Sequence, residues 1–197
     1  IVKDGTELYN KYGIFLAQCI SHIQRYLKGI YDVVNHEAPK KLSDFFTKYN
    51  NLRNKYIDEK IERFNNDEVS NIIKEYDTII DEWECELRND TNNYIFDEEQ
   101  KLFTRLKYDN KKMDSKIRGD RDEVLYFLKD FNVPSTNNNA ESSQRGVKIK
   151  QKIGKFRNEE GANNYLIIKS CILTYKKQNL DILESLIKSF EGLTVLA

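Results

Sequence analysis

Apolar side chains recur at three- and four-residue steps through the middle of the chain, and this periodicity constrains the fold more than any other feature. Side chains at that spacing share one face of an α-helix, which can then pack against other helices. Only 2 Pro and 8 Gly occur among the 197 residues, so few helices are expected to be interrupted. The two longest stripes consist of Leu42, Phe45, Phe46, Tyr49, Leu52, Tyr56 and Ile57, and of Val69, Ile72, Ile73, Tyr76, Ile79, Ile80 and Trp83. The pattern predicts a mainly helical fold in which the tyrosines pack helices together, with base stacking as the alternative role.

Polar breaks divide the rest of the chain into further elements. The Asn-rich pieces at 65–67 and 89–93 are typical of helix boundaries, with Asn66 or Asp67 as the N-cap of the helix that follows. Residues 132–144 predict a loop that becomes helical near Ala140. Further helices are expected at 97–113, 121–131, 159–177 and 180–190, with Asn163 or Asn164 and Asn179 as boundaries.

Residues 1–30 differ from this helical pattern. An apolar dipeptide precedes a turn at Asp4, residues 6–12 are typical of a short helix, and residues 14–20 form a mostly apolar run. We predict a strand, a helix and a second strand, which add a small β component to the fold. Asp4 then follows a strand, where α/β enzymes often place a metal-binding carboxylate, although an Asp-Gly turn is the simpler explanation.

The formal net charge is zero, with 32 basic and 32 acidic residues, but the charges are divided unevenly along the chain. Residues 58–99 hold 15 acids and 4 bases, a balance of −11, so the remaining residues carry +11. This division favours a basic face that binds a polyanion and an acidic face elsewhere.

Glu141 stands directly before the most basic part of the chain. On a helix, Glu141 and Lys148 are two turns apart and share a face with Arg145. The carboxylate could bind a divalent metal and the lysine a neighbouring phosphate. The alternative is a solvated helix face whose first turn carries Glu141 because of the helix dipole. Six bases and no acid occur between residues 145 and 157, namely Arg145, Lys148, Lys150, Lys152, Lys155 and Arg157.

The three cysteines, Cys19, Cys85 and Cys171, argue against a disulfide framework because their number is odd and their spacing wide. A reducing compartment fits this usage better. Cys19 and His22 form a C-x-x-H pair, but zinc requires four ligands and His36 is the only other histidine, so we expect a histidine bonded to the backbone. No run of 18 apolar residues and no secretory signal occurs, so we expect a cytoplasmic protein without a membrane partner.

The stretch from Val133 to Leu186 resembles the C-terminal segment of the insertion-sequence-66 family of bacterial DDE transposases. Members carry a pattern like P-x-D-N-N-x-A-E-R, then V-K-x-K-Q-K, then F-R-S-E-E-G-A, and a helix ending near K-Q-G-x-x-x-L-E. The matching residues are Pro134, Asn137, Asn138, Ala140, Glu141, Val147, Lys148, Lys150, Gln151, Lys152, Phe156, Arg157, Glu159, Glu160, Gly161, Ala162, Lys177, Gln178, Leu183 and Glu184. The start of the chain resembles the family's D-G-Y-x-x-Y…C-W-A-H-x-R-R-K-F stretch through Asp4, Gly5, Tyr9, Cys19, His22 and Arg25.

The resemblance implies a ribonuclease-H-like α/β fold and metal-dependent cleavage and strand transfer of DNA. Three carboxylates of such enzymes hold two Mg²⁺ or Mn²⁺ ions, and the match makes Asp4 the second acid and Glu141 the third, both catalytic and metal-binding. The bases of residues 145–157 would bind DNA, with Lys148 holding the transposon end. The implied partners are transposon-end DNA, target DNA and a second copy in a dimer, and the implied location is the cytoplasm, at the bacterial nucleoid.

The match also implies that the chain is divided into three parts. Residues 1–30 and 126–197 would belong to the ribonuclease-H-like fold, and residues 31–125 would be a large all-helical insertion between them. The first acid has no counterpart and would precede Ile1, so we predict that this chain alone does not cleave DNA. Thr136 stands where the family prefers Asp and Ser142 where it prefers Arg, so a decayed, inactive copy is an open alternative.

A non-catalytic helical DNA-binding or assembly module is the competing hypothesis. In such a module the bases of residues 145–157 bind phosphates and the acidic helices contact proteins, and DNA binding depends on salt but not on Mg²⁺ or Glu141. The distance between the carboxyl groups of Asp4 and Glu141 discriminates between the two hypotheses, because a shared metal pair requires these groups to be close. A purely structural helical protein is the third hypothesis, in which the basic cluster is dispensable for DNA affinity.

Overall fold

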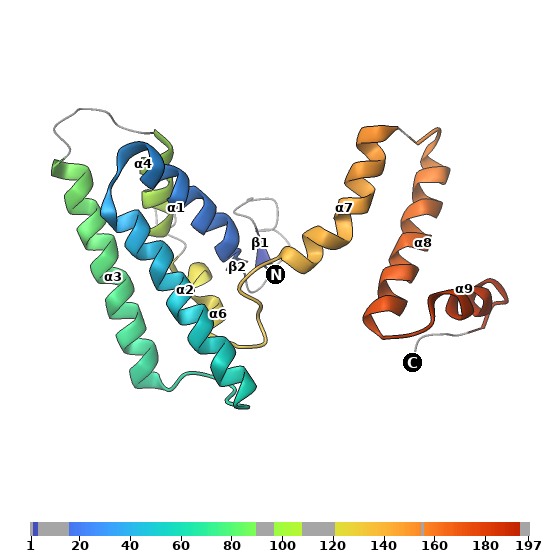
Figure 1. Cartoon of the computed structure of the whole chain (residues 1–197), viewed down its shortest axis with the longest axis horizontal. Helices are drawn as coiled ribbons and strands as arrows, with labels where there is room; N and C mark the ends of the chain where they lie inside the picture. Colours follow the sequence, from blue (N-terminus) through green and yellow to red (C-terminus); the bar gives the residue numbers. More distant parts are fainter. Residues whose placement is uncertain (1, 4–15, 90–96, 108–120, 155, 194–197) are drawn as a thin grey trace, which may run out of the picture. The chain divides into compact units, whose positions relative to one another are not determined.

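The computed structural model describes residues 2–3, 16–89, 97–107, 121–154 and 156–193 (Figure 1). The chain divides into two compact units, residues 1–137 (unit 1) and residues 138–197 (unit 2), and each is described by itself. The predicted mainly helical fold is confirmed. The functional division into residues 1–30, 31–125 and 126–197 stays a prediction.

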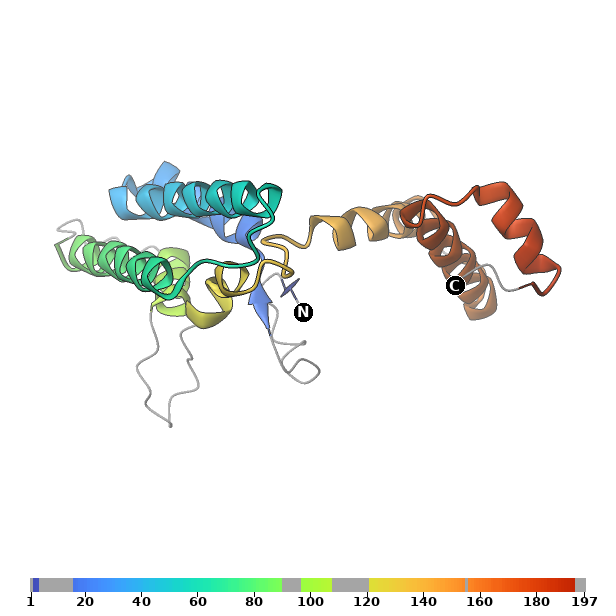
Figure 2. The same cartoon turned by 90° about the horizontal axis from the view of Figure 1, so that it is seen from below.

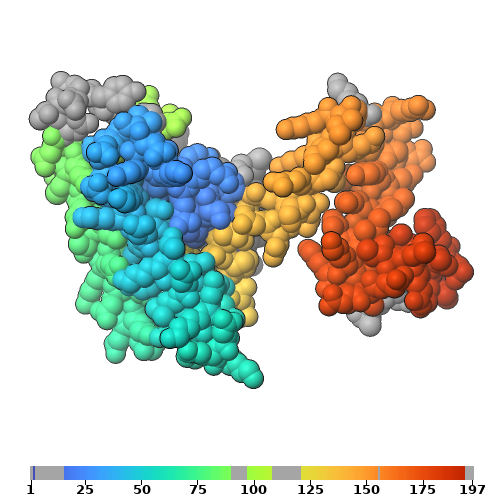
Figure 3. All heavy atoms as spheres, in the orientation of Figure 1, coloured from blue at the N-terminus to red at the C-terminus, as the bar shows by residue number. Residues whose placement is uncertain are grey.

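Unit 1 is a bundle of α-helices built on the apolar stripes, with α1 and α2 side by side and α3 against α2 (Figures 1 and 2). In the space-filling view of Figure 3, the atoms of α1 and α2 form one continuous surface. The predicted stripes lie within α2 and α3. The four longer helices are α1 Ile20–Val34, α2 Glu37–Asp58, α3 Asn66–Asn89 and α4 Asp97–Leu106.

The core of unit 1 is aromatic. Tyr76, Phe46 and Trp83 are fully buried, and the rings of Phe45 and Tyr76 lie 5.7 Å apart between α2 and α3. At the other end of α2, the ring of Tyr56 lies 5.1 Å from that of Phe64. The prediction that the tyrosines pack helices together is therefore confirmed.

Several predicted helix boundaries are wrong. Asn65, not Asn66 or Asp67, caps α3, because its side chain accepts the amide hydrogen of Glu68 at 2.8 Å while Glu68 accepts that of Asn65 at 2.8 Å. This reciprocal capping box places the first helical residue at Asn66. The helix expected at 97–113 ends at Leu106.

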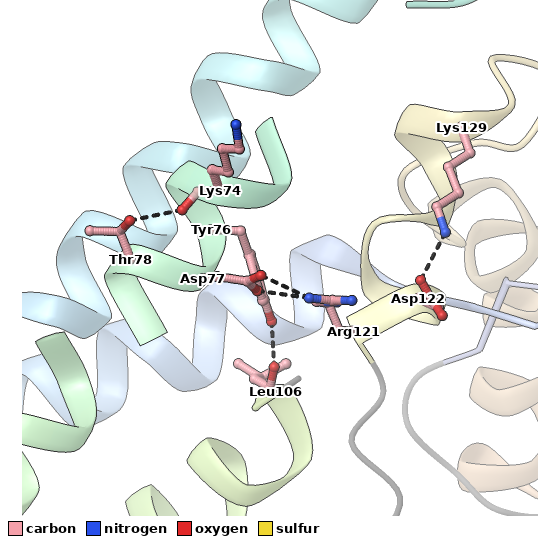
Figure 4. Close-up of polar contacts among 8 residues, drawn as sticks. All are labelled: Lys74, Tyr76, Asp77, Thr78, Leu106, Arg121, Asp122 and Lys129. Atoms are coloured by element: carbon pink, nitrogen blue, oxygen red, sulfur yellow. Dashed lines mark hydrogen bonds and ion pairs between the residues drawn. The ribbon is translucent and has the colours of Figure 1, made fainter. Parts of the chain in front are cut away.

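The helix expected at 121–131 is broken into α5 (Arg121–Val124) and α6 (Tyr126–Lys129), with Leu125 between them. Two contacts with α3 hold this region, as Figure 4 shows. Arg121 Nη1 lies 2.8 Å from Asp77 Oδ2, and the Tyr76 hydroxyl donates to Leu106 O at 2.6 Å. Tertiary contacts therefore fix the ends of α4 and α5 against the same turn of α3.

A small parallel sheet lies at one end of unit 1. Strands β1 (Val2–Lys3) and β2 (Ala17–Gln18) pair with Val2 opposite Ala17 and Lys3 opposite Gln18. The predicted second strand at 14–20 is wrong at its end, because Ile20 already begins α1, and the predicted helix at 6–12 lies outside the described residues. Helix α1 was not expected, although its buried side chains follow helical spacing at Ile20, Ile23, Leu27 and Ile30. Two strands of two residues do not identify a ribonuclease-H-like sheet, so that fold stays a prediction.

Unit 2 consists of α7 (Asn138–Ile153), α8 (Glu159–Lys177) and α9 (Ile182–Phe190). Helix α8 has the predicted bounds, whereas α7 begins earlier than Ala140. The N-terminus of α8 is capped by Asn158, whose side chain accepts from the amide of Gly161. The boundary expected at Asn163 or Asn164 is wrong because both lie inside α8, and the one at Asn179 is confirmed by its left-handed φ of 56°.

Candidate functional site

The loop before α7 is fixed at both of its sides. Arg53 of α2 donates through Nη2 to the carbonyl of Phe131 and, at 3.0 Å, to the carbonyl of Val133. On the other side, the amide of Ile20 donates to Ser135 O at 2.9 Å. The amide of Asn137 donates to Cys19 Sγ at 3.4 Å. Residues 131–137 are therefore held between α2 and the carboxyl end of β2.

The end of β2 is itself bonded to two helices. Gln18 is 2 % exposed, and its amide nitrogen donates to Glu123 Oε2 at 3.0 Å. Its amide oxygen accepts from Arg105 Nη2 at 3.0 Å. A buried amide with both ends bonded costs little to desolvate and holds its neighbours in one geometry. Gln18 thus joins the sheet to α4 and to Glu123 of α5.

Glu141 lies in the first turn of α7, and its side chain is exposed. A carboxylate at this end of a helix is stabilised by the helix dipole, which agrees with the alternative that Glu141 belongs to a solvated helix face. The neighbouring hydroxyls of Ser142 and Ser143 donate to Asn139 O at 3.1 and 2.7 Å. The serines therefore bond to their own helix.

The predicted bases of α7 fall on two different sides of the helix. Arg145, Lys148 and Lys152 follow Glu141 by four, seven and eleven residues, which places all four within about 60° around the axis. Lys150 follows Glu141 by nine residues, which places it on the opposite side, about 180° away. All four bases are exposed. The structure thus separates Lys150 from the face that Glu141 shares with the other three.

Lys169 of α8 lies close to Gly146 of α7, on another side of α7 than Glu141. A Cβ placed on Gly146 would lie 3.5 Å from Lys169 Cε of α8, and Gly146 is about 140° from Glu141 around the helix. The turn between the helices is packed by Phe156 and Tyr165, whose ring centroids lie 5.3 Å apart. Within unit 2, the contact between Gly146 and Lys169 therefore lies on another side of α7 than Glu141.

Two predicted site residues, Asp4 and Lys155, lie outside the described residues. Arg157 follows α7 and is exposed. The described residues contain no group of three His, Cys, Asp or Glu side chains that could hold a metal ion. The chemistry of Glu141 suits Mg²⁺, which prefers carboxylate oxygens, but the predicted pairing with Asp4 stays a prediction.

Two acidic residues of α3 pair with bases of α2. Lys41 Nζ lies 2.8 Å from Glu82 Oε2, and Lys48 Nζ lies 2.9 Å from Glu75 Oε2. Burial opposes the ionisation of Glu75, but hydrogen bonds from Tyr49 and Lys48 outweigh it and hold the pKa of Glu75 below its ordinary value. Part of the acidic segment therefore serves the packing of α2 on α3.

Gln18 and Arg53 were not recognised from the sequence. Arg53 left a signal, because it follows Tyr49 by four residues and precedes Tyr56 by three, within the apolar stripe of α2. A charged residue at a core position needs buried partners, which could have been sought. Gln18 left no such signal, since its partners Arg105 and Glu123 are remote in sequence.

All three cysteines lie among the described residues, and none forms a disulfide. Over the described part of the chain, no helix has the length and apolar character needed to cross a membrane.

Comparison with known proteins identifies the chain at the level of the family. A search of curated proteins and a search of solved structures each found no match. The family model described as "Transposase IS66 family" matches residues 1–164, which is more than four-fifths of the chain. The matched residues include Asp4 and Glu141, and the second motif block is matched as far as residue 164. The chain therefore belongs to the IS66 family of transposases.

Proposed function

We propose that the chain forms part of a DDE transposase that cleaves DNA and transfers the cut strand during transposition. Asp4 and Glu141 are two of its three metal-binding acids, and a first acid has no counterpart in these 197 residues. The ribonuclease-H-like part comprises residues 1–30 and 126–197 and is interrupted by a helical insertion. The partners are transposon-end and target DNA, and the protein self-associates as a dimer.

The anchoring of residues 135–137 at the end of β2 carries this proposal. Lys3 pairs with Gln18, and Asp4 is the next residue along the chain. The amide of Asn137 is bonded to Cys19, the residue after Gln18, and Glu141 is four residues beyond Asn137. The carboxyl ends of parallel strands share one edge of a sheet. The chain segments that precede Asp4 and Glu141 in sequence therefore both include residues at this edge, which supports a shared site.

The exposed face of α7 supports the DNA-binding part of the proposal. Bound Mg²⁺ or Mn²⁺ would activate the attacking hydroxyl and stabilise the leaving oxygen. The chain's own contribution is to hold the metal through carboxylates and the DNA backbone through bases. Arg145, Lys148 and Lys152 share the face of Glu141, so phosphates bound by them would lie beside the metal-binding carboxylate.

Iron-directed cleavage of the polypeptide tests the shared metal site. Fe²⁺ replaces Mg²⁺, and with added hydrogen peroxide and ascorbate the bound ion generates hydroxyl radicals that cut the nearby backbone. We expect cuts near both Asp4 and Glu141, and we expect Asp4→Asn and Glu141→Gln each to remove both sets of cuts. The matched control Glu160→Gln, an exposed acid of α8, should leave both sets unchanged. Cuts at only one of the two segments would refute the shared site.

DNA binding distinguishes the transposase from the competing non-catalytic module, which the exposed bases of α7 also favour. Fluorescence anisotropy with a transposon-end duplex measures affinity against salt. Replacing Lys148 by Gln should lower the slope of log K against log salt by about 0.9, whereas Lys150→Gln on the opposite side should change it less. Tightening by Mg²⁺ that Glu141→Gln abolishes supports the transposase, and binding indifferent to both supports the module.

Nicking of the same duplex tests the predicted inactivity of this chain. Two carboxylates do not hold two metal ions in a productive geometry, so we expect no Mn²⁺-dependent nicking by the 197-residue polypeptide. Clear nicking that Glu141→Gln abolishes would show that the inactivity prediction is wrong while the role of Glu141 is right.

A further inference from the structure

Arg53 is a charged residue in a core position. It lies on the apolar stripe of α2, is 6 % exposed, and has the Phe131 ring 5.6 Å from its guanidinium carbon. Burial lowers the pKa of Arg53, with the charge of Asp130 acting in the opposite direction. Burying a guanidinium costs several kcal/mol unless hydrogen bonds compensate it, so helix packing alone does not explain this residue.

The compensating partners of Arg53 are backbone carbonyls of the loop after α6. Its Nη2 donates to Phe131 O and Val133 O, which lie in an irregular segment whose carbonyls have no helical partners. Its Nη1 donates to the side chain of Asn54 at 3.3 Å. Arginine suits this task because its long, planar group carries several donors and is more weakly hydrated than an ammonium.

The same loop is bonded to the sheet two residues later. Ser135 O accepts from the amide of Ile20, and the Asn137 amide donates to Cys19 Sγ. Residues 131–133 are thus held by α2, and residues 135–137 are held by the end of β2. Without Arg53, the first of these attachments would lose its hydrogen bonds, and the second, which holds the same short loop, would open more often.

We propose that Arg53 is a positioning residue through which the helical part of unit 1 fixes the point where the chain leaves the β2 edge and enters α7. This inference rests on the proposed function, in which Glu141 binds metal beside the strand that precedes Asp4. The helical middle of the chain then has a role in the site: it supplies the group that holds the loop of the third acid. Glu141 is catalytic in this scheme, and Arg53 acts on it through residues 131–137.

Amide hydrogen exchange on the whole chain tests the anchor without any DNA or metal. Arg53→Met keeps the apolar stem of the side chain, although it is shorter, and removes the donors. We expect the amides of Val133, Asn137 and Ile20 to exchange about tenfold faster or more, because the loop loses two buried hydrogen bonds to a charged group. Amides in the middle of α3 should be unchanged. Arg63→Met, at an exposed arginine, is the matched control and should match the unsubstituted chain.

A second variant keeps the test decisive if Arg53→Met does not fold. Arg53→Lys retains the charge, but its ammonium ends about one bond length short of Nη2, so we expect the same amides to exchange faster by a smaller factor. Unchanged exchange at residues 131–137 in a folded variant would overturn the proposal. Equal acceleration throughout α2 and α3 would also overturn it, since that result indicates general destabilisation.

Iron-directed cleavage of the same variants separates this inference from the proposed function. If both are right, Arg53→Lys reduces the cuts near Glu141 at least several-fold while the Arg63→Met control does not. If the unsubstituted chain shows no paired cuts but the local exchange effect is present, the shared metal site is wrong and the anchoring role of Arg53 stands. If the paired cuts persist at full strength in Arg53→Lys, Arg53 does not position Glu141.

Discussion

Replacing the buried carboxylate of Glu99 should destabilise unit 1 by about 3 kcal/mol. Glu99 is 2 % exposed, and its Oε1 accepts from Trp83 Nε1 at 2.7 Å and lies 2.8 Å from His36 Nδ1. Glu99→Leu has a similar volume but leaves the buried indole N–H of Trp83 without an acceptor, which by itself costs about 1–3 kcal/mol. The lost contact with His36, which is only partly exposed, adds a smaller amount.

Urea unfolding followed by tryptophan fluorescence measures this change. Trp83 is the only tryptophan of the chain, so its emission reports on the core of unit 1. With a urea dependence of about 2 kcal/mol per molar, a loss of 3 kcal/mol lowers the midpoint by about 1.5 M. Glu99→Gln is the matched control, because the amide oxygen can still accept from the indole, and we expect less than half of the shift. An unchanged midpoint for Glu99→Leu would refute the role given to this carboxylate.

Two further predictions concern the packing of α2 and α3. Hydrogen bonds from Tyr49 and Lys48 hold the pKa of Glu75 below 4.5, so its stabilisation is complete above that pH and is lost as the pH falls through the lower, folded value. Glu75→Gln should remove this loss of stability at low pH. Because Lys48 and Glu75 are partly exposed, the change in urea midpoint between pH 6 and pH 3 should correspond to less than about 1 kcal/mol. Replacing the cap Asn65 by Ala should cost about 1 kcal/mol in the same assay, and Asn65→Asp, which retains the acceptor for the Glu68 amide, should cost less.

The helices that could be predicted are those whose evidence is local. The stripes of α2 and α3 bury one face each, and a periodic stripe in the sequence is sufficient to locate such a helix. The end of α8 was predicted for a similar local reason, because Asn179 is a favourable residue at a left-handed helix end. Its cap Asn158 was missed in favour of Asn163 or Asn164, which lie inside the helix. The cap of α3 was misplaced by one or two residues because three polar residues in a row, 65–67, compete for that role.

The boundaries that failed depend on contacts remote in sequence. The Tyr76 hydroxyl donates to Leu106 O at the end of α4. Arg121 pairs with Asp77 where α5 begins, and residue 125 interrupts the helix expected there. Neither pairing has a periodic signature in the sequence. A prediction from helix propensity alone therefore placed the end of α4 too late and joined α5 and α6 into one helix. The strand predicted over residues 14–20 contains β2 but was placed too far at its end for another reason: a short apolar run does not distinguish a strand from the start of a buried helix.

Motifs in the sequence predicted the candidate site residues, but they did not predict the residues that hold the neighbouring loop in place. Glu141, Arg145, Lys148, Lys150 and Lys152 could be predicted as candidate site residues because this part of the motif lies within one helix. The loop contacts made by Arg53 and Cys19 join residues about 80 and 118 positions apart, and no local pattern indicates such pairs. The structure also sharpens the motif, since only three of the four bases within α7 share the face of Glu141.

The two departures from the family pattern differ in what they remove from the site. Ser142 is about 100° from Glu141 around α7 and donates to Asn139 O. An arginine at position 142 would therefore not lie on the Glu141 face, and its absence removes no base from that face. Thr136 lies between Ser135 and Asn137, the two residues bonded to the segment that follows β2, so a carboxylate at this position would add an acid next to the proposed site.

Restoring the missing acid should therefore strengthen metal binding, and restoring the missing base should not. We expect Thr136→Asp to lower the Fe²⁺ concentration needed for the paired cuts near Asp4 and Glu141 by about tenfold, because affinity for such cations rises with the number of charged ligands. Ser142→Arg is the control and should leave that concentration unchanged. A decayed copy whose other site residues no longer meet would respond to neither substitution, so equal behaviour of the two variants would count against a metal site at this edge.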